Sequence, residues 1–191
     1  MTVVRTLESP EHKRALLREA RLAAEGVLGL SPSVEEPPPR IEGRFGGVFV
    51  TFWSGPQLRG CVGTFAPTEN IVQTIREVTR QSLADSRFQA DPVSAEELEG
   101  LDIEVSVLSD LEPTLQPASL IPGTHGVVVR RGSRTGCFLP KVAAERGWSA
   151  EEFLSHCCEM KAGLPADAWR SPEAEVLLFT ADAFSESLFR D

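Results

Sequence analysis

Apolar residues recur at helical spacing near the start of the chain and predict an amphipathic helix there. Ser9 can cap this helix, Pro10 suits its first position, and Gly29 is a natural stop. The same kind of spacing predicts further helices over residues 69–84, 141–146 and 150–161. Each of these helices is expected to place its apolar stripe against a sheet.

Alternating or β-branched segments separate the predicted helices and are typical of strands. The predicted strands are residues 45–54, 58–65, 101–109, 126–131, 135–139 and 175–180. Gly55-Pro56 and Gly132-Ser133 provide turns for two hairpins, and the almost wholly apolar last strand is expected to be central. Because hairpins outnumber βαβ units, we expect an α+β fold with a mixed, mostly antiparallel sheet and flanking helices.

Residues 31–40 interrupt this pattern with four prolines and predict a stiff, extended linker after the first helix. The chain shows no internal repeat and no other low-complexity stretch. Its 191 residues suit one domain, so we expect residues 1–191 to form a single domain that contains this linker.

The net charge of the chain bears on which classes of partner it can bind. The formal net charge is −9, which repels nucleic acid unless a local basic patch overrides it. The simplest interpretation of the densest basic cluster is a solvated hairpin turn; this cluster consists of Arg130, Arg131 and Arg134. We therefore expect neither a nucleic acid partner nor, since no stretch approaches the length of a membrane span, a membrane one.

The four cysteines are expected to be reduced thiols in a cytoplasmic protein. The N-terminal residues carry many charges and contain no apolar core of a secretory signal, which favours the cytoplasm. Cys157 and Cys158 are adjacent, which is poor geometry for a structural disulfide. No Cys-x-x-Cys spacing exists, and His156, Cys157 and Cys158 do not all point to one side of a helix, so no metal site is predicted.

The hexapeptide LRGCVG at residues 58–63 is the strongest candidate for a site. If it is extended, Arg59, Cys61 and Gly63 project to one face. A guanidinium beside a thiol would favour the thiolate, and Gly63 would leave open space next to the sulfur. Gly60 and Gly63 would also let a ligand or another backbone come close. The motif could thus hold an anionic group, an activated cysteine, or both.

A structural explanation of the same motif stays open. Gly60 and Gly63 could serve a β-bulge or a tight strand crossing, with Cys61 as a small buried apolar residue.

Three further residues could belong to the site, each with a simpler alternative. His125 lies between glycines and could be a general acid or base, or a turn histidine that satisfies local backbone groups. Glu104 could line a cleft, or lie on the wet face of an amphipathic strand. Lys161 could be a cleft cation, or could interact with the end of its helix.

Four blocks, in this order, resemble the AMMECR1 family. They are LRGCVG (58–63), ELEGLDIEVSVLS (97–109), GTHGVVVRRGSRTGCFLPKVAAERGW (123–148) and KAGLPADAW (161–169). The resemblance runs from about residue 14 to residue 184, and four ordered blocks are far more specific than one hexapeptide. The chain departs from the family where it has Asp85-Ser86-Arg87-Phe88, because the family usually has Asp-Pro-Arg-Phe, and residues 89–91 look like an addition.

The resemblance implies an α+β fold with a larger and a smaller lobe and the hexapeptide close to a cleft between them. It also implies kinship with AmmeMemoRadiSam system protein A, which is named together with a Memo-like protein and a radical SAM protein. It supplies no established activity and no cofactor.

Two functions follow as hypotheses. The first is a binding module for a small anionic ligand or for those partner proteins, with Arg59 and Lys161 fixing an acidic group. The alternative is an enzyme with Cys61 as the nucleophile, Arg59 stabilising its thiolate, and His125 carrying a proton. Whether the chain is an enzyme is left open by its residues.

Overall fold

The chain folds into two compact units in a computed structural model that describes residues 7, 9–31, 37 and 39–190. The N-terminal unit lies within residues 5–108 and 182–191, and the inserted unit is formed by residues 109–181. Residues 32–36 and 38 of the predicted proline linker lie outside the described residues.

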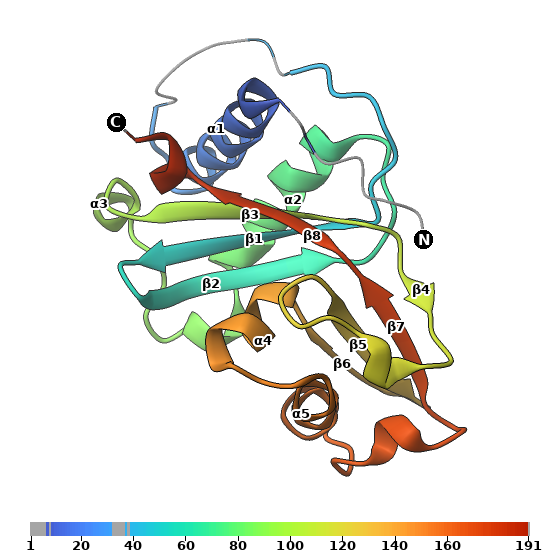
Figure 1. The fold of residues 1–191 in the computed structure, drawn as a ribbon. Helices are drawn as coiled ribbons and strands as arrows, with labels where there is room; N and C mark the ends of the chain where they lie inside the picture. The colour runs from blue at the N-terminus through green and yellow to red at the C-terminus, as the bar shows by residue number, and fades with distance from the viewer. Residues whose placement is uncertain (1–6, 8, 32–36, 38, 191) are drawn as a thin grey trace. The chain divides into compact units, whose positions relative to one another are not determined.

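The N-terminal unit is built on a four-stranded sheet in the order β2-β1-β3-β8 (Figure 1). Its strands are β1 (Gly47–Ser54), β2 (Gln57–Thr64), β3 (Asp102–Leu108) and β8 (Ala181–Ser185). β1 pairs with both β2 and β3 in antiparallel register. β2 is therefore an edge strand of this sheet, with one row of backbone groups that β1 does not satisfy.

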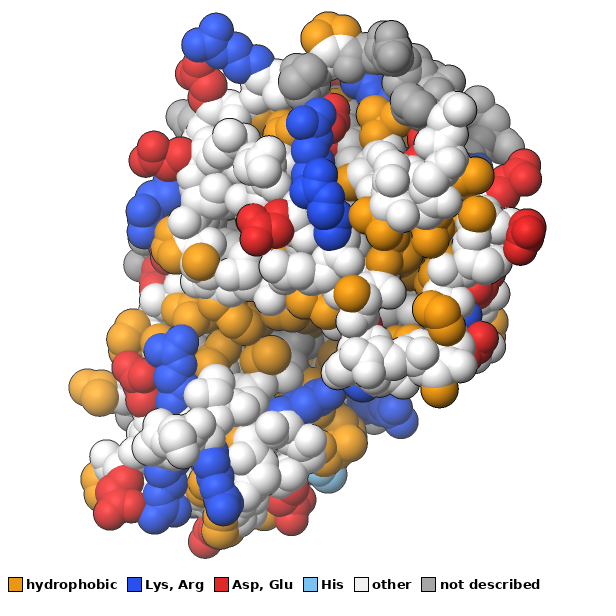
Figure 2. Space-filling view, turned by 180° about the vertical axis from the view of Figure 1, so that it is seen from behind, with side chains coloured by type: hydrophobic (Ala, Val, Ile, Leu, Met, Phe, Trp, Pro, Cys, Tyr) orange, Lys and Arg blue, Asp and Glu red, His pale blue; other side chains and the backbone are white. Residues whose placement is uncertain are grey.

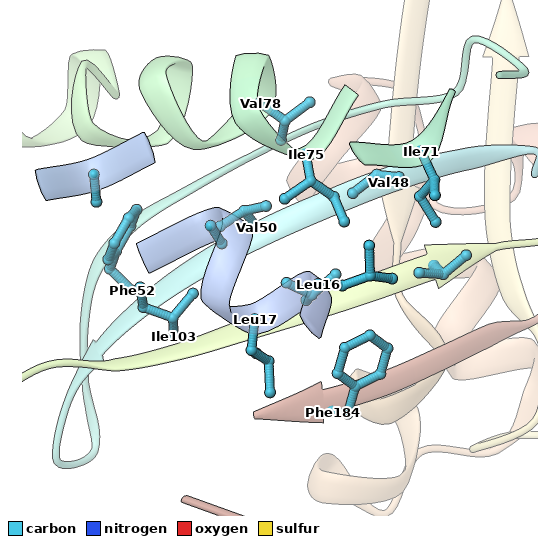
Figure 3. Packing of buried hydrophobic residues seen from close by; sticks show 14 of the residues in the cluster. Leu16, Leu17, Val48, Val50, Phe52, Ile71, Ile75, Val78, Ile103 and Phe184 are labelled. Atoms are coloured by element: carbon cyan, nitrogen blue, oxygen red, sulfur yellow. The ribbon is translucent and has the colours of Figure 1, made fainter. Parts of the chain in front are cut away.

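Helices cover one face of this sheet and form the core of the unit (Figures 1 and 3). They are α1 (Pro10–Val27) and α2 (Ile71–Leu83), with the short α3 (Ala95–Leu98) after them. Leu16 of α1 and Ile75 of α2 are fully buried against alternate residues of the strands, among them Val50 (Figure 3). Because side chains alternate along a strand, the residues between these core positions lie on the opposite face of the sheet.

The inserted unit has its own antiparallel sheet in the order β4-β7-β5-β6. The strands are β4 (Glu112–Pro113), β5 (Gly126–Arg131), β6 (Arg134–Phe138) and β7 (Glu175–Phe179). β7 pairs with β4 on one side and with β5 on the other, so the prediction that this apolar strand is central is confirmed.

Three consecutive helical segments pack on the sheet of the inserted unit. They are α4 (Pro140–Arg146), α5 (Ala150–His156) and a π-helix (Cys157–Ala162). The predicted helix over residues 150–161 thus changes its hydrogen bonding after His156. Gly136 of β6 lets the π-helical backbone come close, since a Cβ there would lie less than 3.0 Å from the Ala162 nitrogen.

The predicted α+β class, with mostly antiparallel strands and flanking helices, is confirmed. The prediction that the strand at residues 175–180 ends the fold was wrong, because β8 follows it at once and joins the other sheet.

The face shown in Figure 2 carries Lys and Arg side chains interspersed with Asp and Glu. Within the described residues, each helix is too short or too polar to cross a bilayer. The same residues contain no group of three His, Cys, Asp or Glu side chains arranged to hold a metal ion.

Candidate functional site around Cys61

A β-bulge in β2 decides where the hexapeptide side chains point. Phe52 of β1 pairs with Gly60, and the next residue, Trp53, pairs with Leu58. Arg59 is thus the extra residue of β2, and a bulge of this kind turns a side chain away from strict alternation. The prediction that Arg59 and Cys61 are neighbours on one face fails for this reason.

Arg59 binds carboxylates. Its Nε and Nη2 donate to the two carboxylate oxygens of Glu97 at 2.6 and 2.9 Å, and its Nη1 donates to Asp91 at 3.0 Å. The Arg59 side chain is buried, and the hydrogen bonds to Glu97 raise the pKa of its guanidinium above the usual value. Its predicted contact with the thiol is not formed, while Asp91, in the segment that looks like an addition, has a structural role.

Arg87 is the cation beside Cys61. Its Nη2 donates to the Cys61 carbonyl oxygen at 2.9 Å and to Asp85 at 2.6 Å, while its Nε donates to Asp85 at 3.0 Å. Hydrogen bonds to Asp85 raise the pKa of the Arg87 guanidinium most, and the nearby Cys61 side chain raises it a little further. Within the described residues, Nη1 makes no hydrogen bond, and 52% of the side chain is exposed.

Asp85 joins Arg87 to the edge of the sheet. Its Oδ2 accepts the backbone N–H of Cys61 at 3.0 Å, so Asp85 and Arg87 together satisfy both outward-facing backbone groups of this residue. The Asp85 side chain is almost fully buried, and its pKa is lowered to about 2, chiefly by the hydrogen bonds from Arg87. The pair therefore closes a sheet edge that would otherwise be open to another strand.

The Cys61 side chain lies in a row that crosses three strands. Thr51 of β1 pairs with Cys61 on one side and with Glu104 of β3 on the other. The Thr51 hydroxyl donates to the Cys61 sulfur at 3.3 Å. Paired residues of adjacent strands project to the same face, so Glu104 lies about 10 Å from Cys61, with Thr51 between them.

Comparison with known proteins identifies the chain. A family model described as AMMECR1 matches residues 13–184. The chain belongs to the AMMECR1 family. Protein MK0488 of Methanopyrus kandleri is 42% identical in an alignment 195 residues long. The alignment covers 95% of this chain and 90% of that protein. Protein PH0010 of Pyrococcus horikoshii is 39% identical, with 90% and 88% of the two chains covered. The resemblance carried by the four ordered blocks is thereby confirmed.

A solved AMMECR1 structure has the same fold. The crystal structure of PH0010, described as an uncharacterized protein, superposes with a TM-score of 0.82 at 34% identity. The superposition covers 93% of this chain and 92% of the other.

Both glycines of the AMMECR1 hexapeptide allow close packing. A Cβ on Gly60 would lie less than 3.0 Å from the carbonyl oxygen of Ser82, at the end of α2. The Ser82 hydroxyl in turn donates to Val50 at 2.9 Å and accepts the N–H of Val62 at 3.1 Å. The prediction of open space at Gly63 was wrong, because the ring of Phe49, its partner in β1, covers it.

His125 and Lys161 belong to the inserted unit of this AMMECR1 domain. The His125 Nδ1 accepts the backbone N–H of Ile121 at 2.9 Å, which is the local contact expected of a turn histidine. Lys161 lies in the π-helix, with its Nζ 5.1 Å from the centre of the Phe138 ring. Roles for both residues beside Cys61 stay predictions.

The residues that sequence reasoning missed as site residues are Thr51, Ser82, Asp85 and Arg87. The spacing Asp85-x-Arg87 directly after a helix was a signal for a mutual ion pair. The sequence gives no sign that this pair binds the backbone of a residue more than twenty positions earlier.

Proposed function

We propose that this AMMECR1 domain is a binding module whose recognition site is the Cys61 edge of β2, with Arg87 as the residue that contacts an acidic group. The supporting observation is that the guanidinium of Arg87 is held in place but, within the described residues, is not fully hydrogen-bonded. Asp85 and the Cys61 carbonyl fix its guanidinium, and Nη1 keeps its hydrogen-bonding capacity within the described residues. A guanidinium held in place loses little entropy when it binds a carboxylate or a phosphate.

Arg87 takes the place that Arg59 had in the sequence-based hypothesis. The Nε, Nη1 and Nη2 atoms of Arg59 already donate to Glu97 and Asp91, so a ligand would have to break these bonds. Breaking a buried ion pair leaves an uncompensated charge, which opposes ligand binding there.

The partners in this proposal are a Memo-like protein and a radical SAM protein, as the family resemblance implies. An acidic side chain on either protein would suit Arg87, and the half-buried thiol of Cys61 beside it would add an apolar contact.

Isothermal titration with a purified Memo-like protein and a purified radical SAM protein tests this proposal. We expect Arg87→Met to weaken binding to at least one of them about tenfold, as the loss of one hydrogen bond between charged groups does. Arg170→Met is the matched control, because Arg170 is equally exposed at 53% and is also paired with one carboxylate, that of Glu151. Equal affinities for wild type, Arg87→Met and Cys61→Ala would place recognition elsewhere.

A cysteine-dependent enzyme is the second candidate, and the Thr51 hydroxyl is the observation that favours it. The hydroxyl donates to the sulfur at 3.3 Å and orients it, and a guanidinium is bound to the carbonyl oxygen of the same residue. Cys61 would then be the nucleophile, and His125 keeps its place as the candidate proton carrier.

Alkylation by iodoacetamide at neutral pH tests the nucleophile. We expect Thr51→Val and Arg87→Met each to slow the alkylation of Cys61 roughly fivefold, because each removes a group that is hydrogen-bonded to this residue. Cys137 is also half-buried and lies in the other unit, so its rate should not change. Unchanged rates at Cys61 in both variants would remove the chemical basis of the enzyme hypothesis.

A further inference from the structure

Cys61 is the only cysteine of the N-terminal unit, and its surroundings differ from those of the adjacent pair Cys157 and Cys158. Cys157 and Cys158 are fully buried, and burial raises the pKa of both thiols. Cys61 is partly exposed, receives the Thr51 hydroxyl at its sulfur, and has Arg87 bound to its carbonyl oxygen. Within the described residues, a partly exposed sulfur, a hydroxyl donor and a guanidinium whose Nη1 makes no hydrogen bond are thus gathered at one residue.

We propose that Cys61 is a peroxide-reactive cysteine, and that Thr51 and Arg87 form a site for a hydroperoxide against its sulfur. The Thr51 hydroxyl donates to the sulfur and holds it in position for attack. Arg87 Nη1 donates to the peroxide oxygen that leaves, where negative charge develops as the O–O bond breaks. Asp85 holds the guanidinium in place through Nε and Nη2, so that Nη1 is the nitrogen left to the peroxide.

The reaction is a two-electron transfer with a defined balance. The Cys61 thiolate attacks one peroxide oxygen, an S–O bond forms, and the O–O bond breaks. The electron pair of that bond leaves with the other oxygen, which takes a proton from solvent and becomes water, or an alcohol from an alkyl hydroperoxide. Sulfur is oxidised to a sulfenic acid and the peroxide is reduced.

In this proposal an external thiol returns Cys61 to its reduced form. Because the N-terminal unit contains no other cysteine, no thiol of this unit can condense with the sulfenic acid. An external thiol would do so, forming a mixed disulfide and releasing water, and a second external thiol would then reduce the disulfide.

Oxidation would also change recognition at the edge of β2. The sulfenic acid places an additional oxygen beside Arg87, where it can accept from Nη1 and compete with an acidic partner group. Cys61 oxidation itself is measured on the free protein, so it is tested independently of the proposed binding function.

The test uses the reduced, full-length protein with a small excess of hydrogen peroxide and with dimedone to trap sulfenic acid. Peptide mass spectrometry then gives the labelling rate at each of the four cysteines. We expect Cys61 to be labelled about tenfold faster than the half-buried Cys137. Thr51→Val and Arg87→Met should each slow Cys61 labelling about tenfold, Thr51→Ser should restore it, and Arg170→Met should leave it unchanged.

The comparison with iodoacetamide separates a peroxide site from a generally reactive thiol. If Arg87 acts on the leaving oxygen, Arg87→Met lowers the rate with peroxide by a larger factor than the rate with iodoacetamide. Equal factors for the two reagents would overturn the proposed peroxide site. Labelling of Cys61 no faster than that of Cys137 would overturn the proposal as a whole. Thermal unfolding of each variant identifies any loss of rate that comes from loss of the fold.

Discussion

Gly60→Ala is expected to cost about 3 kcal/mol of folding free energy, at the upper end of what overpacking causes. A Cβ at this position would meet the backbone carbonyl of Ser82, and a backbone atom at a helix end does not rotate away as a side chain would. The helix would have to move off the sheet, and the Ser82 hydroxyl would lose its bonds to Val50 and Val62. Urea unfolding at neutral pH, followed by circular dichroism, measures this loss.

Gly26→Ala is the matched control for that substitution. Gly26 lies exposed in α1, and a Cβ there would have no heavy atom within 4 Å. Since alanine favours a helix over glycine, we expect this variant to gain about 0.5–1 kcal/mol. If Gly60→Ala costs no more than about 0.5 kcal/mol, the close contact between α2 and β2 does not limit stability.

Hydrophobic periodicity predicted most elements of both units because burial on one face imposes it directly. In β3, Ile103 and Val105 alternate with Glu104 and Ser106, and this alone gave the side of the sheet on which each residue lies. β8 was missed for the same physical reason. It follows β7 without a turn signal, and Phe184 is the only residue of its five that is fully buried.

The geometry of the candidate site depends on a one-residue irregularity that no periodicity shows. Strict alternation of side chains through the hexapeptide predicted Arg59 and Cys61 on the same face of the strand. The bulge at Arg59 breaks this alternation, so the two side chains do not lie on the same face. The space beside Gly63 was likewise decided by the pairing register, which brings Phe49 opposite to it.

Long-range pairs are the other part of the site that the sequence left open. Asp85 and Arg87 form an ion pair with each other directly after α2. Their binding to the backbone of Cys61 requires the end of α2 to lie at the edge of β2, which depends on the packing at Gly60 and Ser82. The residue predicted beside Cys61 was Arg59, whereas in the structure Arg59 binds Glu97 and Arg87 binds the Cys61 carbonyl oxygen.

Asp85→Asn is expected to cost about 2 kcal/mol at neutral pH and to lose this effect in acid. The pKa of Asp85 lies at about 2 in the folded protein, against an ordinary value of 3.8, so folding favours its ionised form by about 2 kcal/mol. Because the folded-state pKa is the lower one, the contribution is complete above about pH 4 and is lost as the pH falls towards 2. Urea unfolding of both proteins at pH 7, 4 and 3 measures the difference.

The pH dependence of that difference in stability distinguishes the effect of the Asp85 charge from the effect of the side chain's shape. Asn keeps a carbonyl oxygen that can accept the Cys61 N–H, while the carboxylate charge and its ion pair with Arg87 are lost. Only the part of the cost that comes from this charge responds to pH. Asp91→Asn is the matched control, because the Asp91 side chain is 83% exposed and its partner Arg59 keeps both bonds to Glu97. That variant should cost less than about 0.5 kcal/mol. A cost for Asp85→Asn that stays constant from pH 7 to pH 3 would contradict the ion pair as its cause and would leave Arg87 without its anchor in the proposed site.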